Sequence, residues 1–465
     1  MLLSRRTAVR VARVTHPQII RPSAAARLER IPISSFHRQM MWVLGFIFFF
    51  EIGDINTFSY AAPAILRQWH LSISEISVVV SGTFFGMFAG GSIGGWISDR
   101  AGRRKGLIYT TLWYSGFSLL NAFVSGRTSL LLTRLLTGVG LAAMTVVGIT
   151  YVSEMFPTKS RGKYQGLILM IGFVGVPAMA YVARFLIPLA PWGWRLVFVW
   201  GSLGGVLAVF AKGLQESPRW LEKCGRTKEA DEVLTRIEER VRVERGDLPL
   251  TQEPVMIRLR RRAYNDLFRP AHRRQTAVLI VAWVCQTLGM YGFMAWVPTL
   301  LVAHGFSLVN SLSWSSAMSI GSIPGPLLAA AIADRWERKW SIAAVALTMA
   351  GCGLLYGMTF RTIPIIVFGF LLAMFGPAFG SLLYTYTPEA YPTEIRNSGV
   401  GLTYAIGRLA NVTGPLLVAF FYNHFGYMSV FVYIATCWVV VAITVSGFGM
   451  RTKARSLEQL SEATA

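Results

Sequence analysis

The chain has 465 residues, of which 53% are hydrophobic and only 15% are charged, and its mean hydropathy is +0.48. An average soluble domain carries about 25% charged residues, so this composition excludes an ordinary soluble protein. The formal net charge of +22 would suit a nucleic-acid partner, but the basic residues gather in short connections between apolar runs. That distribution is typical of a membrane protein, and no nucleic-acid partner is expected.

Long apolar runs recur along the whole chain, beginning with MWVLGFIFFF at residues 41–50. A helix needs about 20 mostly apolar residues to cross the hydrocarbon core of a bilayer. The sequence therefore predicts an all-α membrane protein with twelve transmembrane helices, at residues 40–62, 75–97, 106–125, 129–152, 164–187, 195–213, 275–302, 311–332, 340–359, 363–386, 398–421 and 427–449.

Most of the 45 Lys and Arg residues lie in the tails and in alternate connections between these spans. Because basic residues are enriched on the cytoplasmic side, both termini and the 212–274 loop are expected there, in a multi-pass protein of the cell (inner) membrane. Residues 228–241 of this loop have an amphipathic, helical pattern. The Arg-rich residues 1–38 would also suit an organelle transit peptide, but a basic cytoplasmic tail is the simpler interpretation.

Two segments of the first half of the chain recur in the second half. ISDRAGRRK (97–105) returns as IADRWERKW (332–340), and EMFPTKSRGKYQG (154–166) returns as EAYPTEIRNSGVG (389–401). Both are displaced by 235 residues, which chance matches would not share. Parallel repeats of this kind predict two pseudo-symmetric six-helix halves with a substrate site between them and alternating access by rocking.

The predicted organisation follows from this repeat. Glycines at four-residue spacing on the second predicted helix form a stripe that allows another helix to pack closely against it. The interface between the two halves is one candidate place for this packing. The stripe comprises Gly82, Gly86, Gly90 and Gly94. The predicted domains are a basic tail (1–39), an amino-terminal half (40–213), a central cytoplasmic loop (214–274), a carboxy-terminal half (275–450) and a cytoplasmic tail (451–465).

Four motifs resemble the major facilitator superfamily or branches of it, over about residues 40–450. GWISDRAGRR (95–104) resembles its loop signature between helices 2 and 3, and RLLTGVG (134–140) its helix 4 signature. ESPRWLEKCGR (216–226) is similar to the sugar-porter and organic-ion branches. FEIGD (50–54) resembles the start of aromatic-acid and nicotinate-type proton symporters, with Glu in place of the first Asp. The resemblance implies a secondary transporter.

The loop signature and its repeat place charges at the predicted inner helix ends. Asp99 and Arg100 are expected to form an ion-pair latch that holds one conformation and breaks in the other. In the second copy Trp336 and Glu337 interrupt the signature, so its latch is expected to be weaker. The predicted gating residues are Asp99, Arg100, Arg103, Glu154 and Arg161, with Asp334, Arg335, Glu389 and Arg396 in the second half.

Charged residues inside predicted spans are costly and therefore indicate function. Glu51 and Asp54 lie one helical turn apart on helix 1, and Arg134 lies in helix 4 at a depth where it could meet Asp54. A pair that separates and rejoins would take up and release a proton. The sugar-porter branch uses such a pair, which implies proton coupling by these three residues. A static ion pair is the structural alternative.

Arg408 lies near the middle of helix 11, and the predicted carboxy-terminal half has no acidic residue deep in a span. A guanidinium binds a carboxylate with two parallel hydrogen bonds, so this pattern favours an anionic substrate. The position resembles the helix 11 Arg of organic-anion carriers. The other predicted substrate-binding residues are Asn411, Gln286, Tyr291, Trp296 and Tyr384.

The leading hypothesis is thus proton-coupled symport of a small organic anion, such as an aromatic or heterocyclic monocarboxylate. A sugar or polyol symporter, an efflux antiporter and a non-transporting receptor are the alternatives. Enzymatic catalysis is not expected, because no nucleophile–base set or phosphate-binding loop is seen, and the four cysteines show no metal spacing. The expected partners are a small solute, protons and the lipid bilayer, for a monomer that uses the proton gradient without cofactor or metal.

Overall fold

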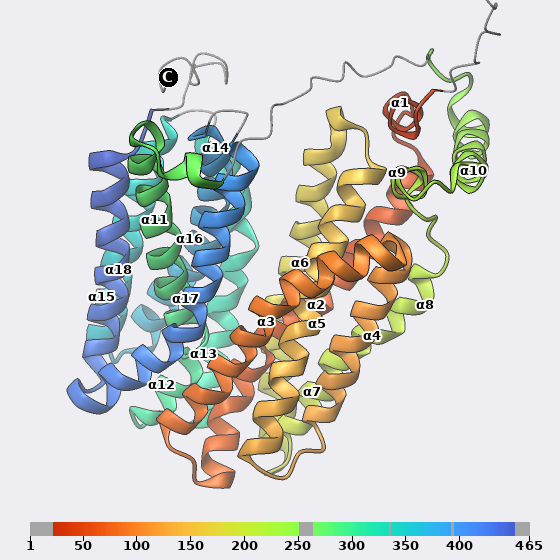
Figure 1. Cartoon of the computed structure of the whole chain (residues 1–465). Coiled ribbons are helices and arrows are strands. Elements are labelled where there is room, and N and C mark those ends of the chain that lie inside the picture. The colour runs from red at the N-terminus through yellow and green to blue at the C-terminus, as the bar shows by residue number, and fades with distance from the viewer. Residues whose placement is uncertain (1–21, 251–263, 334–335, 392–394, 452–465) are drawn as a thin grey trace, which may run out of the picture.

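The computed structural model describes residues 22–250, 264–333, 336–391 and 395–451. Within these ranges all regular secondary structure is helical (Figure 1). Ten helices there are long and apolar enough to cross a membrane. The two remaining predicted spans are α4 (Arg103–Asn121), which begins with three basic residues, and an interrupted segment at 308–333. The predicted all-α fold with twelve spans is confirmed.

The amino-terminal half contains six spans, most of which begin a few residues before the predicted ones. The sixth span is continued through a short 3-10 turn. The helices are α2 (Ser35–Trp69), α3 (Ile73–Ala101), α4, α5 (Arg127–Met155), α6 (Thr158–Leu186) with η1 (Ile187–Leu189), and α7 (Trp194–Ser202), η2 (Leu203–Val206) and α8 (Leu207–Ala211).

The carboxy-terminal half repeats this order. Its first two spans are each divided. A proline lies in the first turn of the last piece of each, Pro298 in α12 and Pro324 in α14, because a proline lacks the amide hydrogen that would continue the preceding helix. The helices are η3 (Tyr264–Phe268), α11 (Pro270–Met294), α12 (Val297–Ala303), α13 (Leu308–Ser319), η4 (Ile320–Ser322), α14 (Pro324–Ala333), α15 (Arg338–Met358), α16 (Thr362–Glu389), α17 (Arg396–Phe425) and α18 (Tyr427–Phe448). The predicted domain bounds stay predictions.

A single hydrogen bond repeats in the two halves at the predicted offset. The Tyr151 hydroxyl donates to the backbone oxygen of Gln215, and the Tyr386 hydroxyl donates to that of Met450 over 3.0 Å. Both donors and both acceptors are displaced by 235 residues. The internal repeat of the sequence is therefore a repeat of structure, including the chain that leaves the last helix of each half.

The glycine stripe of α3 packs inside the amino-terminal half. A Cβ atom on Gly86 or Gly90 would lie 2.0 or 2.2 Å from backbone oxygens of α5, those of Leu135 and Val139. Gly321 repeats this contact in the other half, 2.3 Å from the Phe370 oxygen of α16. Placing the stripe at the interface between the halves is therefore wrong: it brings α3 against α5, where small residues permit close backbone approach.

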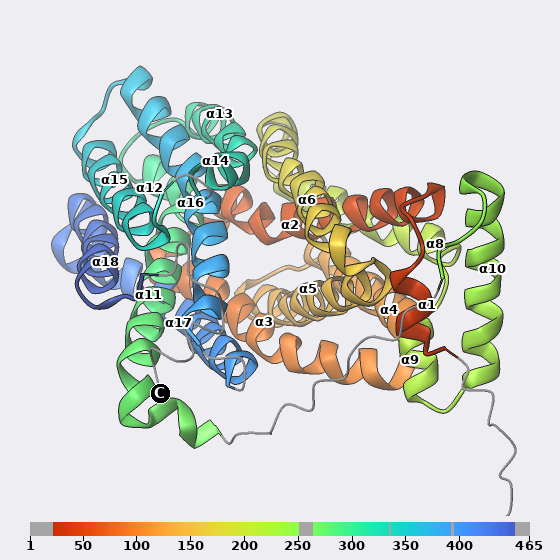
Figure 2. The same ribbon diagram turned by 90° about the horizontal axis from the view of Figure 1, so that it is seen from above.

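The two halves contact each other at one end and diverge toward the other, where α1 (Ala24–Glu29), α9 (Pro218–Lys223) and α10 (Thr227–Arg245) lie (Figure 1). At the contacting end Arg184 of α6 donates to Ser313 of α13 over 2.8 Å, and Asn423 of α17 donates to Ser74 over 2.7 Å. Figure 2 shows α3 and α17 side by side in the middle, where the halves meet. The predicted helix at 228–241 is confirmed as α10.

Candidate functional site

The deepest charges of the amino-terminal half form an ion pair. Nη1 of Arg134 on α5 lies 3.5 Å from Oδ2 of Asp54 on α2, and both side chains are buried. The other oxygen of Asp54 accepts a 2.6 Å hydrogen bond from the Ser118 hydroxyl of α4. A Cβ atom on Gly201 of α7 would lie 2.3 Å from this oxygen, so the glycine leaves room for the carboxylate. Four helices thus meet at Asp54.

The Arg134 side of this pair is loosely held. Its 3.5 Å contact is longer than an ordinary hydrogen bond, and in the described ranges its Nε and Nη1 atoms have no hydrogen-bond partner. The guanidinium lies 5.6 and 5.8 Å from the rings of Phe58 and Phe198. A cavity of about 20 Å³ adjoins it and also touches Tyr291, which leaves room for one water. The pair can therefore separate without breaking a strong hydrogen bond.

Glu51 is the second buried acid of α2. Its Oε1 atom accepts a 2.6 Å hydrogen bond from the Thr145 hydroxyl of α5, and its side chain is only 2% exposed. It forms no ion pair with any described residue, although it interacts electrostatically with Asp54 and with Arg408. The interior of the amino-terminal half therefore holds two acids and one arginine.

Arg408, midway along α17, lies among aromatic rings. Its Nε atom donates to the Tyr404 hydroxyl over 2.8 Å, and its guanidinium lies 5.0 Å from the Tyr404 ring. The rings of Trp283 and Tyr384 lie 4.9 Å apart, and Trp283 is 5.2 Å from Tyr404. Arg408 is partly exposed and makes no ion pair among the described residues. A cation beside an aromatic cluster is thus left without an acidic partner in contact.

The charges of the two halves face each other across their interface. Phe84 of α3 and Tyr291 of α11 pack edge to face, with ring centres 5.0 Å apart. Tyr291 also lines the cavity beside Arg134, and it lies near enough to Arg408 on its own half and to Glu51 on the other half for their charges to act on its hydroxyl. The charged regions of the two halves therefore approach each other around Tyr291.

The other predicted substrate residues are less closely connected to Arg408. Asn411 is buried one turn after Arg408, and its Oδ1 atom has no partner among the described residues. Gln286 is buried and donates to the sulfur of Met290 over 3.4 Å. Trp296 is 1% exposed and packs in the core. Tyr291 and Tyr384 are the predicted aromatic residues that share the surroundings of Arg408.

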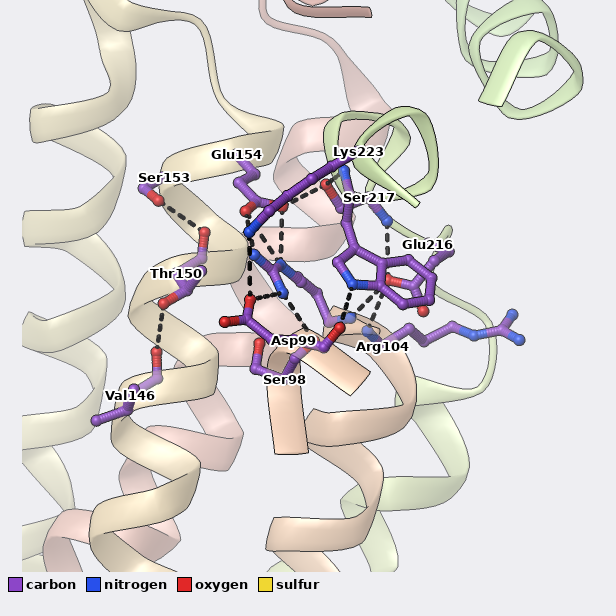
Figure 3. Close-up of polar contacts among 12 residues, drawn as sticks. Ser98, Asp99, Arg104, Val146, Thr150, Ser153, Glu154, Glu216, Ser217 and Lys223 are labelled. Atoms are coloured by element: carbon purple, nitrogen blue, oxygen red, sulfur yellow. Dashed lines mark hydrogen bonds and ion pairs between the residues drawn. The ribbon is translucent and has the colours of Figure 1, made fainter. Parts of the chain in front are cut away.

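A polar network closes the end of the amino-terminal half where α1 and α9 lie (Figure 3). Arg103 is its centre, donating to Glu154 over 2.7 Å and to Asp99 over 3.0 Å. Glu216, before α9, accepts from the backbone amides of Arg103 and Arg104 at 2.7 and 3.0 Å. The network thus ties α3, α4 and α5 to the chain that follows the sixth span.

The predicted pairing of Asp99 with Arg100 is wrong, because Arg103 occupies that role. Arg103 lies four residues after Asp99 and turns back toward α5, whereas the Arg100 guanidinium lies 4.6 Å from the Trp96 ring. Arg161 donates its backbone amide to Pro157, and its side chain forms no hydrogen bond or ion pair within the described part of the chain. The observed ion-pair network therefore centres on the second arginine of the motif.

The second half carries a simpler version of this network. Arg338, displaced by 235 residues from Arg103, lies 3.1 Å from Glu389, the counterpart of Glu154. Arg396 donates to the backbone oxygens of Pro388 and Tyr391 over 3.0 and 3.3 Å. The predicted gating residues Asp334 and Arg335 lie outside the described residues.

Several partners were not predicted from the sequence. Arg338 follows from the 235-residue offset applied to Arg103, and Glu216 belongs to a motif already recognised. For Ser118 and Thr145, by contrast, the sequence has no signal, because isolated hydroxyl residues are common in spans. Tyr404 lies four residues before Arg408, a helical spacing that brings the two side chains together.

No three His, Cys, Asp or Glu side chains in the described ranges are placed to hold a metal ion. Two six-helix halves with buried charges at their interface define a secondary transporter of the major facilitator fold. A family model described as "Sugar (and other) transporter" matches residues 38–463, and the chain belongs to this family.

The similar proteins are transporters, not enzymes. The chain is 44% identical over 445 residues to YyaJ of Bacillus subtilis (strain 168), whose name assigns it provisionally to metabolite transport; 95% of this chain and 98% of YyaJ are covered. It is 31% identical over 437 residues to the niacin transporter NiaP of Acinetobacter baylyi, covering 94% and 99%. The partially occluded, inward open structure of the xylose transporter XylE from E. coli superposes with a TM-score of 0.70 at 18% identity, covering 91% and 100%.

Proposed function

We propose that the protein is a proton-coupled symporter of a small organic anion, of the aromatic or heterocyclic monocarboxylate kind, that works by alternating access. The observation that carries the proposal is Arg408, a partly exposed cation without an acidic partner in contact, beside Trp283, Tyr384 and Tyr404. A guanidinium binds a carboxylate through two parallel hydrogen bonds, and aromatic side chains stack on a flat ring. The niacin transporters among the relatives support this substrate class.

The proton pathway is proposed to use Asp54 and Glu51. Substrate carboxylate bound at Arg408 would neutralise a charge that now interacts with Glu51, which shifts the proton affinity of Glu51 and of its neighbour Asp54. When Arg134 moves away from Asp54, the unpaired carboxylate takes up a proton, and it releases the proton when the pair forms again. No cofactor is required, because the gradient supplies the energy, and a monomer suffices.

Uptake by proteoliposomes tests the substrate class. Labelled nicotinate and benzoate are offered to the purified full-length protein under an imposed pH gradient. Losing two hydrogen bonds to a charged group costs about 1.5–3 kcal/mol each, so Arg408→Ala is expected to reduce uptake at least tenfold. Arg408→Lys keeps the positive charge but lacks the planar guanidinium. Its uptake should therefore lie between that of the unchanged protein and that of Arg408→Ala.

Arg361→Ala is the matched control, because Arg361 is exposed at a helix end outside the site. Unchanged carboxylate uptake by Arg408→Ala would contradict the proposal. Gradient-driven uptake of xylose or glucose, with no carboxylate uptake, would favour the sugar alternative that the family name allows.

The proposed location is the cytoplasmic membrane, with both termini inside. Cys224, beside α9, is exposed, while the other three cysteines lie within helices of the spans. A membrane-impermeant maleimide should therefore label Cys224 in inverted vesicles and spare it in intact cells. Cys224→Ser should remove this label. Labelling of Cys224 in intact cells would reverse the proposed orientation.

A further inference from the structure

At one position of the repeat, the two halves carry residues of opposite charge. In the amino-terminal half, Tyr151 binds the backbone of Gln215, and the next residue is Glu216. In the carboxy-terminal half, Tyr386 binds the backbone of Met450, and the next residue is Arg451. The repeated hydrogen bond establishes that Glu216 and Arg451 are structural counterparts. An acid in one half is thus replaced by a base in the other.

This exchange removes the acceptor for a helix N-terminus. Glu216 accepts from the amides of Arg103 and Arg104, the first two residues of α4. Their counterparts are Arg338 and Lys339, the first two residues of α15. No described side chain accepts hydrogen bonds from those two amides. The first amides of a helix point outward with partial positive charge and attract anions, and the described residues leave this pair of amides without an acceptor.

The side chains around this helix start are also basic. Lys339 is 9% exposed and forms no hydrogen bond or ion pair with any described residue. Its Nζ atom lies 5.4 Å from the Trp340 ring, and the positive charges of Arg451 and Arg274 lie near enough to repel it. Arg274 lies 5.6 Å from the ring of Phe448, the last residue of α18, which places it beside Arg451. Among the described residues, Glu337 is the acid whose charge acts on Lys339.

An apolar groove of about 420 Å³ begins at the same place and runs between α15 and α18. Trp336 and Trp340 lie at its charged end, and Leu347 and Ile443 line its further part. These four side chains are 49–62% exposed. Figure 2 shows α15 and α18 on the side of their half that faces away from the other half, so in a membrane the groove faces lipid.

We infer that this surface is a binding site for an anionic phospholipid. The phosphate takes the place that Glu216 has in the other half, accepting from the amides of Arg338 and Lys339 between Lys339, Arg274 and Arg451, and an acyl chain lies in the groove. Basic pockets at the cytoplasmic ends of transmembrane helices recognise anionic headgroups, and tryptophans prefer the headgroup level. The site is separate from Arg408 and does not depend on the proposed substrate.

Native mass spectrometry of the delipidated full-length protein tests the site by titration with phosphatidylglycerol or phosphatidylcholine. A basic residue near the membrane surface contributes about 1 kcal/mol of attraction, or roughly fivefold in affinity. Arg451→Gln, which changes an exposed side chain after the last helix, should weaken phosphatidylglycerol binding about fivefold. The double variant, Lys339→Gln with Arg451→Gln, should weaken phosphatidylglycerol binding further. Neither the single nor the double variant should change phosphatidylcholine binding.

Two further measurements distinguish the contribution of the headgroup site from that of the apolar groove. Ala344→Phe, which fills the exposed groove wall, should weaken the binding of both lipids, and an excess of inorganic phosphate should not displace phosphatidylglycerol. Lys212→Gln, an exposed charge at the inner end of α8, is the matched control and should bind as the unchanged protein does. Equal affinity for the two lipids, full binding by the double variant, or displacement by phosphate alone would overturn the inference.

Discussion

The two halves of the molecule share one scaffold but differ in the charges of their interiors. In the amino-terminal half, Asp54, Glu51 and Arg134 are sealed among four helices and at most 2% exposed. In the carboxy-terminal half, Arg408 is partly exposed beside tyrosines. A sealed acid–base pair suits proton exchange, whereas an accessible cation suits a ligand. On the proposed function, the two halves would therefore divide proton coupling and substrate binding between them.

The 235-residue offset separates scaffold from function. The features that recur at this offset are structural: the glycine contacts on α5 and α16, the two tyrosine hydrogen bonds, and the Arg–Glu pairs. The buried charges of the candidate site do not recur at this offset. Asp54 corresponds to Gly289, which packs against Trp438, and Arg408 corresponds to Phe173. The two charged sites are therefore not part of the structural repeat.

The largest expected effect is on the sealed pair. Asp54→Asn keeps the shape of the side chain and its contact with Ser118 but removes the titrating group. Gradient-driven accumulation should be lost completely, whereas exchange of labelled for unlabelled substrate should persist. Arg408→Ala should abolish both, because it removes the binding charge. Measuring both uptake and counterflow in the same proteoliposomes distinguishes the Asp54→Asn variant from the Arg408→Ala variant.

Asp247→Asn, on the exposed end of the central loop, is the control for loss of one carboxylate. Full accumulation by Asp54→Asn would show that the proposed division between the halves is incorrect.

The inner-end pairs should differ in strength. Arg103 is 6% exposed and binds Glu154, Asp99 and the backbone of Ser98. Arg338 is 22% exposed and its ion pair is with Glu389. Removing one partner of a buried pair costs about 3–5 kcal/mol, while an exposed pair contributes about 1 kcal/mol or less. Arg103→Gln should therefore lower the midpoint of thermal unfolding in detergent far more than Arg338→Gln, and equal effects would contradict the asymmetry.

The glycine contacts should matter equally in both halves. A Cβ atom on Gly90 or Gly325 would lie 2.2 or 2.4 Å from a backbone oxygen of the neighbouring helix, whereas Gly91 has open space. Overpacking costs about 1–3 kcal/mol, so Gly90→Ala and Gly325→Ala should each lower the unfolding midpoint. Gly91→Ala should raise it slightly, because alanine favours a helix by about 1 kcal/mol over glycine. Tolerance of Gly90→Ala would contradict the packing.

The sequence predicts the helices and the repeat better than it predicts contacts. Hydrophobic length determines the spans, and an ion pair inside lipid has few alternatives, so Asp54 and Arg134 could be matched across helices. Which face of a helix meets which neighbour depends on packing that hydropathy does not encode. That is why the interface between the halves is a wrong candidate place for the glycine stripe, and why the sequence pairs Asp99 with Arg100 although Arg103 is the observed partner. It is also why Tyr404 was missed beside Arg408.

The smallest expected effect concerns residues 24–38, which comprise α1 and the start of α2 and which pack against α10. Glu244 of α10 accepts from the amide of Ser35 over 2.7 Å and from Arg38 over 3.0 Å, and these bonds lower its pKa to about 2. Because the folded-state pKa is depressed, this contact is fully present above the ordinary value of 4.5 and is lost only as the pH falls through about 2.

Hydrogen exchange of residues 24–38, corrected for intrinsic rates, should therefore not change between pH 8 and pH 5, whereas Glu244→Gln should speed it modestly at every pH. Glu232→Gln, on the exposed face of the same helix, should have no effect. Faster exchange on acidification to pH 5 would mean that another group controls the docking of residues 24–38 against α10. Unaltered exchange in Glu244→Gln would mean instead that Arg27 and Arg30, which bind Glu238, are sufficient to hold this segment on the amino-terminal half.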